Sequence, residues 1–195
     1  MAADPKPEDR PLRADARRNR ERILVAARYA CAEHGASVQI DDVARSAGVG
    51  VGTVYRHFPT KDALIEALVA EKFRITSENM RAALEIEDPW ESFAEALRRN
   101  AEVMAADAGL RDALIRLAPS TLHTSEARQE TDELGSRLIA RAQAAGVLRD
   151  DITVDDIGAL MGGLCLSMAH PDLDWRRHLD LLLDGLRARS DRTSA

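Results

Sequence analysis

The feature that most constrains the fold is the spacing of small and apolar residues in segment 39–58, QIDDVARSAGVGVGTVYRHF. Counted from Ile40, a small residue stands at the fifth place (Ala44), a glycine at the ninth (Gly48) and a branched apolar residue at the fifteenth (Val54). Two helices that cross steeply through a short turn need a small side chain where their backbones approach. They also need a residue that tolerates positive φ in the turn and an apolar residue that locks the second helix onto the first. The spacing therefore predicts a helix-turn-helix over residues 39–58.

The second helix of this motif is predicted at about Val51 to His57. Unrolled at about 100° per residue, it turns Val54 and Phe58 inward. Its outward and flanking positions belong to Val51, Gly52, Thr53, Tyr55, Arg56 and His57. Glycine is a poor helix former, but its missing side chain lets a backbone come close to phosphates or base edges. A short helix with such an outer arc fits the major groove of DNA.

An anion site is predicted directly after the motif. Thr60 is expected to cap the next helix, with Lys61 in its first turn, so that a cation and the positive end of a helix dipole are presented together. The inferred anion is a DNA phosphate. The glycines at 48, 50 and 52 do not match the dinucleotide-binding fingerprint, because they follow a helix and the third glycine comes one place early.

The distribution of charge agrees with a nucleic-acid partner, although the whole chain carries a formal charge of −6. Residues 10–61 hold ten basic and five acidic side chains, whereas the rest of the chain holds 17 basic and 28 acidic ones. A solvated charged face is the alternative explanation for such an imbalance. The helix-turn-helix inside the basic segment favours DNA.

The remainder of the 195-residue chain is predicted to be helical, giving an all-α fold of about nine helices. Only 4% of residues are aromatic, apolar residues recur at three- and four-residue spacing, and no segment alternates as a strand does. Capping residues predict helix starts at Asp88, at Thr153 and at Asp172 or Asp174. Prolines and glycines, among them Gly135, are expected to separate the helices.

Four regions are predicted along the chain. Residues 1–14 are expected to form a disordered arm, 15–75 a DNA-binding domain, 76–190 a helical ligand-binding and dimerisation domain, and 191–195 a disordered tail. No apolar stretch approaches the roughly 18 residues that span a bilayer, and the N-terminus lacks the apolar core of a signal peptide. A cytoplasmic protein without a membrane partner is therefore predicted.

No catalytic, metal or cofactor site is predicted. The chain lacks a zinc-binding HExxH helix, a GxSxG nucleophile elbow and a Walker lysine loop. Cys31 and Cys165 stand far apart in helical segments, which argues against a disulfide scaffold or a four-ligand zinc site. The carboxylates Asp155 and Asp156 stand at a helix start, where capping explains them.

The N-terminal region resembles the DNA-binding domain of the tetracycline-repressor (TetR) family of bacterial transcriptional regulators. The resemblance is carried by AGVGVGTVYRHFPTK, residues 47–61, and extends over residues 17–73. It implies homodimers that bind palindromic operators through paired helix-turn-helix units, with a helical C-terminal domain that dimerises and binds a small ligand. It further implies that bases or nearby backbone are faced by Val51, Gly52 and Thr53, and that phosphates are held by Tyr55, His57 and Lys61.

Two residues depart from the family pattern. Gln39 stands where the family usually has a Ser or Thr that caps the helix and touches phosphate, and Gly50 stands where Ser is common. Both contacts are left open, although the amide of Gln39 is still able to donate a hydrogen bond.

In the C-terminal half, soft apolar side chains are candidates for an effector site that takes a hydrophobic or aromatic molecule. These candidates are Trp90, Phe93, Met104, Met161 and Met168. Packed core is the alternative for each. Polar candidates are His123, Arg141 and His170, for which an ordinary surface position is the alternative.

The last two predicted helices carry apolar faces and small residues that permit a close approach between two copies of the chain. The predicted dimer interface consists of Gly158, Gly162, Leu166, Leu179, Leu182, Leu183 and Leu186. Burial within one chain is the alternative.

Together these features predict a ligand-responsive repressor that binds a palindromic operator as a homodimer and is released by a small hydrophobic or aromatic effector. The alternative is a helical ligand-binding or interaction protein whose helix-turn-helix packs against protein.

Overall fold

The computed structural model describes residues 9–34, 37–109, 111 and 126–188, and it confirms the all-α prediction. Eight α-helices lie in this part of the chain, where about nine were predicted for the whole. They are α1 (Asp9–His34), α2 (Ile40–Ala47), α3 (Val51–His57), α4 (Lys61–Leu84), α5 (Pro89–Ala106), α7 (Glu126–Ala144), α8 (Val154–Ser167) and α9 (Trp175–Leu186). The predicted tail, His123 and residues 1–8 of the predicted arm lie outside the described residues.

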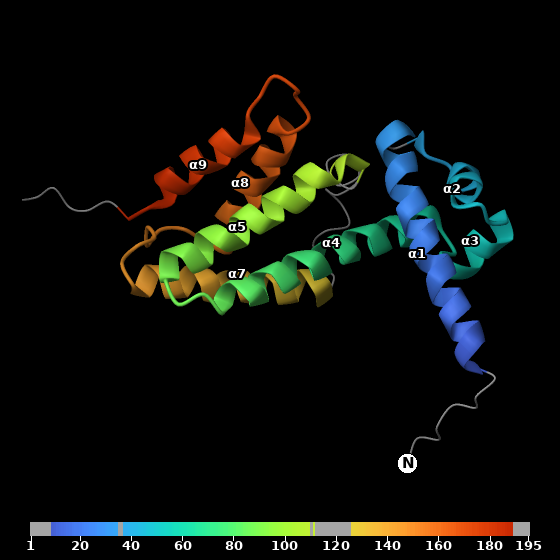
Figure 1. The fold of residues 1–195 in the computed structure, drawn as a ribbon, viewed down its shortest axis with the longest axis horizontal. Coiled ribbons are helices and arrows are strands. Elements are labelled where there is room, and N and C mark those ends of the chain that lie inside the picture. The colour runs from blue at the N-terminus through green and yellow to red at the C-terminus, as the bar shows by residue number, and fades with distance from the viewer. Residues whose placement is uncertain (1–8, 35–36, 110, 112–125, 189–195) are drawn as a thin grey trace, which may run out of the picture.

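Figure 1 shows two lobes joined by α4. The smaller lobe consists of α1, α2, α3 and the first half of α4, and the larger lobe consists of the rest of α4 with α5, α7, α8 and α9. None of the described helices combines the length and the apolar character needed to cross a bilayer.

The core of the smaller lobe forms where the apolar faces of its helices meet. Ile23 and Ala27 of α1, Val43 of α2 and Val54 of α3 are all 0–1% exposed. Leu68 of α4 packs into the same cluster. The helices of this lobe each bury one face and leave the opposite face of α3 to solvent, as the period of their apolar residues requires.

The first helix begins earlier than predicted. Its backbone is helical from Asp9, whereas residues 1–14 were expected to form a disordered arm. Pro11 falls in the first turn, where the N–H that proline lacks would have no partner within the helix, so it does not oppose the helix there. The other end agrees with prediction, since α1 stops at His34, before Gly35.

Helix α4 takes part in both lobes. Leu64 and Leu68 belong to the core of the smaller lobe, Ile65, Val69 and Phe73 form a separate small cluster, and Ala83 belongs to the core of the larger lobe. The predicted domain boundary between residues 75 and 76 therefore lies inside one continuous helix. No loop interrupts α4 between the two lobes.

The larger lobe confirms three of the predicted helix starts. The Asp88 side chain accepts a hydrogen bond from the backbone N–H of Glu91 at 2.8 Å. Thr153 and Asp156 form a reciprocal capping box, and Asp174 caps α9. Capping is a local interaction, so a short stretch of sequence is sufficient to predict it.

Gly135 does not separate two helices, as was predicted, but lies inside α7. A Cβ atom at this position would lie 3.0 Å from Cγ2 of Val154. The glycine is explained by the close approach of α7 to the start of α8.

Candidate DNA interface and effector cavity

The turn of the predicted helix-turn-helix is built on Gly48. Its backbone is left-handed, with φ 63° and ψ 37°, and its N–H donates to the carbonyls at the end of α2. A residue with a side chain adopts this conformation only at a cost, so glycine is favoured here. Arg22 of α1 braces the turn, since its Nη2 donates to the carbonyl of Ala47 at 2.8 Å. Val54 is fully buried beneath α3, so the geometry is the one that the spacing predicts.

Helix α3 keeps its outer face open. Val51 is 37% exposed and Tyr55 49% exposed. Gly52 and Arg56 are also exposed, and Thr53 and His57 are half-buried. A Cβ atom added at Gly52 would meet no atom within 4 Å. Nothing in the described protein covers the start of this helix.

The residues on either side of the motif differ in their capping. Gln39 is the N-cap of α2 but makes no side-chain cap, because its Nε2 donates instead to the carbonyl of Ser37 at 2.8 Å. Thr60 does cap α4, accepting from the N–H of Ala63 at 3.0 Å, and Lys61 follows in the first turn. The positive end of α4 and a lysine are therefore presented beside α3.

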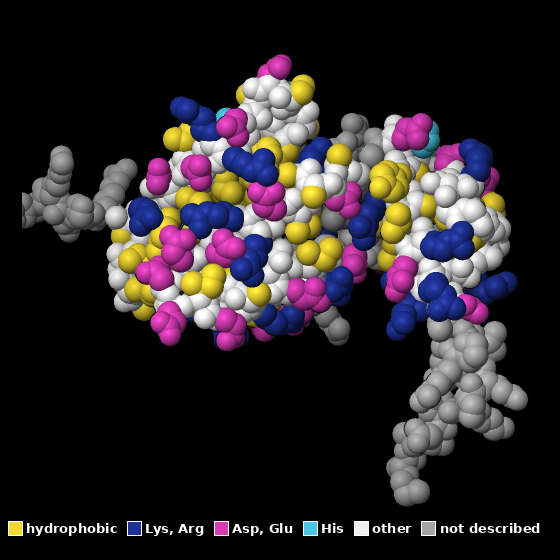
Figure 2. Space-filling view, in the orientation of Figure 1, with side chains coloured by type: hydrophobic (Ala, Val, Ile, Leu, Met, Phe, Trp, Pro, Cys, Tyr) yellow, Lys and Arg dark blue, Asp and Glu magenta, His cyan; other side chains and the backbone are white. Residues whose placement is uncertain are grey.

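Basic side chains of α1 lie beside this face. The guanidinium of Arg20 lies 5.4 Å from the ring centroid of Phe58, at the end of α3. Arg17 and Arg18 are exposed further toward the start of α1. Figure 2 shows several Lys and Arg side chains where α1 emerges from the smaller lobe. The smaller lobe thus presents an open helix among cations, which is what a polyanion with a groove requires.

The larger lobe contains a cavity of about 510 Å³ between α4, α5, α7 and α8. Of the predicted effector residues, Phe93, Met104 and Met161 line it. Trp90 and Met168 are not among its lining residues, which corrects the prediction. Trp90 is 5% exposed and lies under the guanidinium of Arg187 at 4.0 Å, and Met168 packs against the core at the end of α8.

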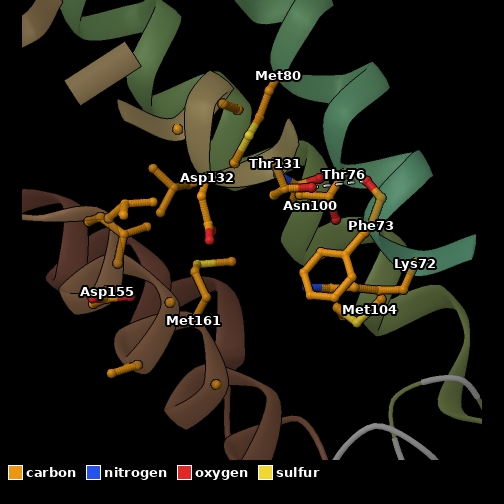
Figure 3. A pocket seen from close by; sticks show the side chains of 18 of the residues that line it. Lys72, Phe73, Thr76, Met80, Asn100, Met104, Thr131, Asp132, Asp155 and Met161 are labelled. Carbon is orange, nitrogen blue, oxygen red and sulfur yellow. Dashed lines mark hydrogen bonds between the residues drawn. The ribbon is translucent and has the colours of Figure 1, made fainter. Parts of the chain in front are cut away.

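Polar and soft residues that the sequence did not assign to an effector site also line the cavity. They include Lys72, Thr76, Met80, Asn100, Arg111, Arg128, Thr131, Asp132, Asp155 and Cys165. Figure 3 shows that they come from separate helices that converge on one space. Lys72 and Thr76 stand one turn apart in α4, but other polar residues surround them in the sequence, so no sequence signal marks them as cavity residues.

The charged side chains that line the cavity differ in their partners. Arg128 contacts Asp132 at 2.7 Å and Asp155 at 3.5 Å, so that one guanidinium serves two carboxylates. The ammonium of Lys72 lies over the ring of Phe73, 4.4 Å from its centroid. Burial lowers the pKa of Lys72 below that of an ordinary lysine, and it raises the pKa of the Cys165 thiol.

The remaining polar candidates have other positions. Arg141 donates to the carbonyls of Leu84 and Ile86, so it closes the end of α4 and does not face the cavity. His170 is exposed in the turn after α8. Neither is among the residues that line the cavity.

The predicted dimer face is only partly available on the surface of the chain. Leu179, Leu183 and Leu186 are 3–4% exposed within one chain, so these three leucines are corrected from interface to core. Leu182 also packs against that core. The exposed members of the prediction are Gly158, Gly162 and Leu166, the last of which is 54% exposed.

Other exposed apolar residues lie on α8 and α9. Leu160 is 40% exposed and Leu181 is 58% exposed. Only Ile157 and Leu164 of α8 are buried within the chain. A helix rich in apolar residues that buries so few of them is typical of a surface that another protein covers.

The two lobes also touch beyond α4. Nη1 of Arg28 in α1 lies 3.2 Å from a carboxylate oxygen of Asp107, the residue that follows α5. Gly109 lies so close to α1 that a Cβ atom there would be 2.8 Å from the carbonyl oxygen of Arg28. Segment 107–109 is therefore braced directly against the smaller lobe.

Two family models match the chain. The model described as bacterial regulatory proteins of the tetR family matches residues 23–68. The model described as the C-terminal domain of SbtR-like transcriptional regulators matches residues 88–188, about half of the chain.

Individual proteins agree with this result. The HTH-type transcriptional repressor KstR of Mycolicibacterium smegmatis is 32% identical over 146 residues, covering 72% of this chain and 71% of KstR. The crystal structure of a TetR transcription regulatory protein from Mycobacterium vanbaalenii is 38% identical, with a TM-score of 0.62, and the match covers 91% of this chain and 99% of that one. A TetR transcriptional regulator from Streptomyces coelicolor is 35% identical, with a TM-score of 0.60, and the match covers 88% of this chain and 99% of that one.

Proposed function

The chain belongs to the tetR family of bacterial regulatory proteins and is a DNA-binding transcriptional regulator, and from that premise we propose that it is a repressor. It binds a palindromic operator as a homodimer and is released when a small, mainly apolar effector enters the cavity of the larger lobe. The single observation that carries this proposal is the open outer face of α3, held by the turn at Gly48 and flanked by the start of α4.

The DNA-binding residues are assigned from their positions. Val51, Gly52 and Thr53 form the first turn of α3 and would enter the major groove. The residues placed to hold phosphates and the flanking backbone are Gln39, Tyr55, Arg56, His57 and Lys61. Since the Gln39 side chain is already bound to Ser37, its phosphate contact would require that bond to break.

Dimerisation is assigned to α8 and α9. Gly158, Gly162, Leu166 and Leu181 are exposed on these helices, and the first three also line the cavity, so the proposed interface borders the effector site. A two-fold axis through this surface uses the same patch on both copies. It would place two copies of α3 in successive major grooves, about one DNA turn or roughly 34 Å apart.

Effector release is assigned to the cavity and α4. The cavity lies beside Lys72 and Thr76 of α4, and the same helix begins with Lys61 at the DNA face. A bound molecule that displaces α4 would change the spacing of the two recognition helices. For this to release DNA, the effector must bind the displaced state more tightly than the DNA-bound state.

Selection of bound duplexes from a random pool tests the proposal. We expect a palindrome whose half-sites are separated by about one helical turn. Mobility shifts on the selected duplex should weaken steeply with salt, because phosphate contacts release counterions. Enrichment of no sequence, or of a single half-site without symmetry, would contradict the dimeric operator-binding role.

A further inference from the structure

The cavity has a polar character that differs between its two ends. Figure 3 shows Lys72, Phe73 and Met104 together at one end, and Asp155 with Met161 on the other side of the space. Arg111 also lines the cavity, and its Nη1 donates to the carbonyl of Met104 at 3.2 Å. Lys72 and Arg111 thus place two basic side chains on the wall of the cavity.

The guanidinium of Arg128 lies near the same phenyl ring as Lys72, 5.8 Å from the centroid of Phe73. Arg128 is bound by Asp132 through two short contacts and also lies 3.5 Å from Asp155. A cation between two carboxylates offers little attraction to a further anion, and the carboxylates already have a partner. Arg128, Asp132 and Asp155 together carry one positive and two negative formal charges, so this group does not attract an anion.

Lys72 differs from these groups, because no carboxylate lies within salt-bridge distance of its ammonium among the described residues. Its close neighbour is the face of Phe73, which offers a cation–π contact, and the carboxylate of Asp132 acts on it without forming an ion pair. Burial around it lowers its pKa, which means that the surroundings disfavour its charge. An ammonium held at the wall of an apolar cavity gains most from an anionic partner that arrives with a ligand.

We propose that the effector is an apolar carboxylic acid whose carboxylate pairs with Lys72 while its hydrophobic body fills the space lined by Phe93, Met104 and Met161. This inference rests on the proposed function, because it names the chemical class of the effector for that same cavity.

The volume and the lining of the cavity limit what the rest of the effector can be. A volume of about 510 Å³ is in the range of small-molecule sites, which is roughly 300–1,000 Å³. The remaining walls are mainly apolar and include flexible methionines that adapt to different shapes. A single ammonium matches the single charge of a carboxylate, whereas a phosphate within the cavity would present more charge and more acceptor atoms than Lys72 can satisfy.

Calorimetric titration of the purified full-length protein with matched pairs of probes tests the proposal. Dodecanoic acid is compared with 1-dodecanol, and 2-naphthylacetic acid with 2-(2-naphthyl)ethanol. Each pair keeps one hydrophobic body and changes only the anionic head. We expect at least one of the two acids to bind at least tenfold more tightly than its alcohol. The proposal is overturned if neither acid binds or if each alcohol binds as tightly as its acid.

Substitutions in α4 test whether the preference for acids over alcohols depends on the ammonium of Lys72. Lys72→Met should reduce the acid preference to about twofold or less, and Lys72→Arg should retain most of it. Arg74→Met is the matched control, since it removes one positive charge from the exposed side of the same helix, where Arg74 pairs with Glu71 and Glu78. Binding of the alcohol to Lys72→Met shows that the cavity is still folded. If that variant does not fold, Lys72→Gln takes its place. An acid preference that survives the loss of the ammonium overturns the proposal.

Operator binding is measured separately, by mobility shift without any probe. A protein that prefers acids but binds no operator would refute the proposed function and leave the ligand class intact. A protein that binds its operator but prefers the alcohols would refute the ligand class and leave the proposed function intact.

Discussion

Replacing Gly52 by alanine should raise stability and weaken DNA binding at the same time. Gly52 is the second residue of α3, and an added Cβ atom would meet nothing within 4 Å in the protein. Alanine favours a helix over glycine by about 0.5–1 kcal/mol, so the free energy of unfolding should rise by up to that amount. For a chain of this size that gain corresponds to an increase in Tm of about 1–4 °C.

The effect on DNA has the opposite sign. If the start of α3 lies against the major groove, the new methyl group occupies space that base edges or phosphates would otherwise fill. We expect the operator affinity to fall by at least tenfold, or about 1.4 kcal/mol. The loss should persist across salt concentrations, because the substitution removes no charge and leaves the number of phosphate contacts unchanged.

Fluorescence anisotropy with a labelled operator duplex, together with thermal unfolding of the same samples, measures both effects. Gly185→Ala is the matched control, since Gly185 lies exposed in α9 and also meets nothing within 4 Å. It should be stabilised in the same way; because Gly185 lies one turn from Leu181 on the proposed dimer helix, its DNA binding is compared with that of the parent after size-exclusion chromatography shows that the dimer is kept. If Gly52→Ala is more stable yet keeps its operator affinity within twofold, the first turn of α3 does not face DNA and the assignment fails.

Further substitutions test the other assignments. Lys61→Ala should weaken binding to all sequences alike and reduce the salt slope by about one, whereas Thr53→Ala should change the preferred sequence; equal, sequence-independent losses from both would contradict their separate roles. Leu181→Glu places a charge on a leucine that is 58% exposed, and we expect monomers in size-exclusion chromatography and weaker operator binding; unchanged dimers would place the interface elsewhere. Arg28→Ala removes the 3.2 Å contact with Asp107 and should lower stability by about 1 kcal/mol or less. Its larger expected effect is a weaker response of operator binding to effector in mobility shifts, and an unaltered response would show that this contact carries no signal.

The helix-turn-helix could be predicted from sequence because its determinants are local. The left-handed turn at Gly48, the buried position of Val54 and the cap at Thr60 each depend on residues within about one turn of the chain. The departure at Gln39 could also be read from the sequence, because glutamine lacks the hydroxyl with which a Ser or Thr caps the helix. The start of α1 was misplaced because the weak propensity of a charged, proline-containing segment does not define where a helix begins.

The cavity could be predicted only in part, because an apolar residue that lines a cavity and one that fills a core have the same sequence pattern. Trp90 was assigned to the cavity but is covered by Arg187, a residue from the end of the chain. Lys72 resembles an ordinary surface lysine in the sequence until four helices close around it. Leu179 shows the same limit at the dimer face, since helical periodicity marks an apolar stripe without saying which protein covers it.

The positions of Lys61 and Lys72 on one uninterrupted helix imply a reciprocal effect between the two ligands. If α4 moves as a rigid body, any displacement that improves the site at Lys72 also displaces Lys61 at the DNA face. Segment 107–109 is braced against α1 at Arg28, so the smaller lobe has a fixed contact against which α4 can turn. Because linkage is symmetric, the operator must lower the affinity for the acid by the same factor by which the acid lowers the affinity for the operator. Titrating the acid into free protein and into operator-bound protein measures this factor from one side, and titrating the operator with and without saturating acid measures it from the other. A mutual change of less than twofold would mean that the two sites of α4 are not coupled, even if each binds its ligand as proposed.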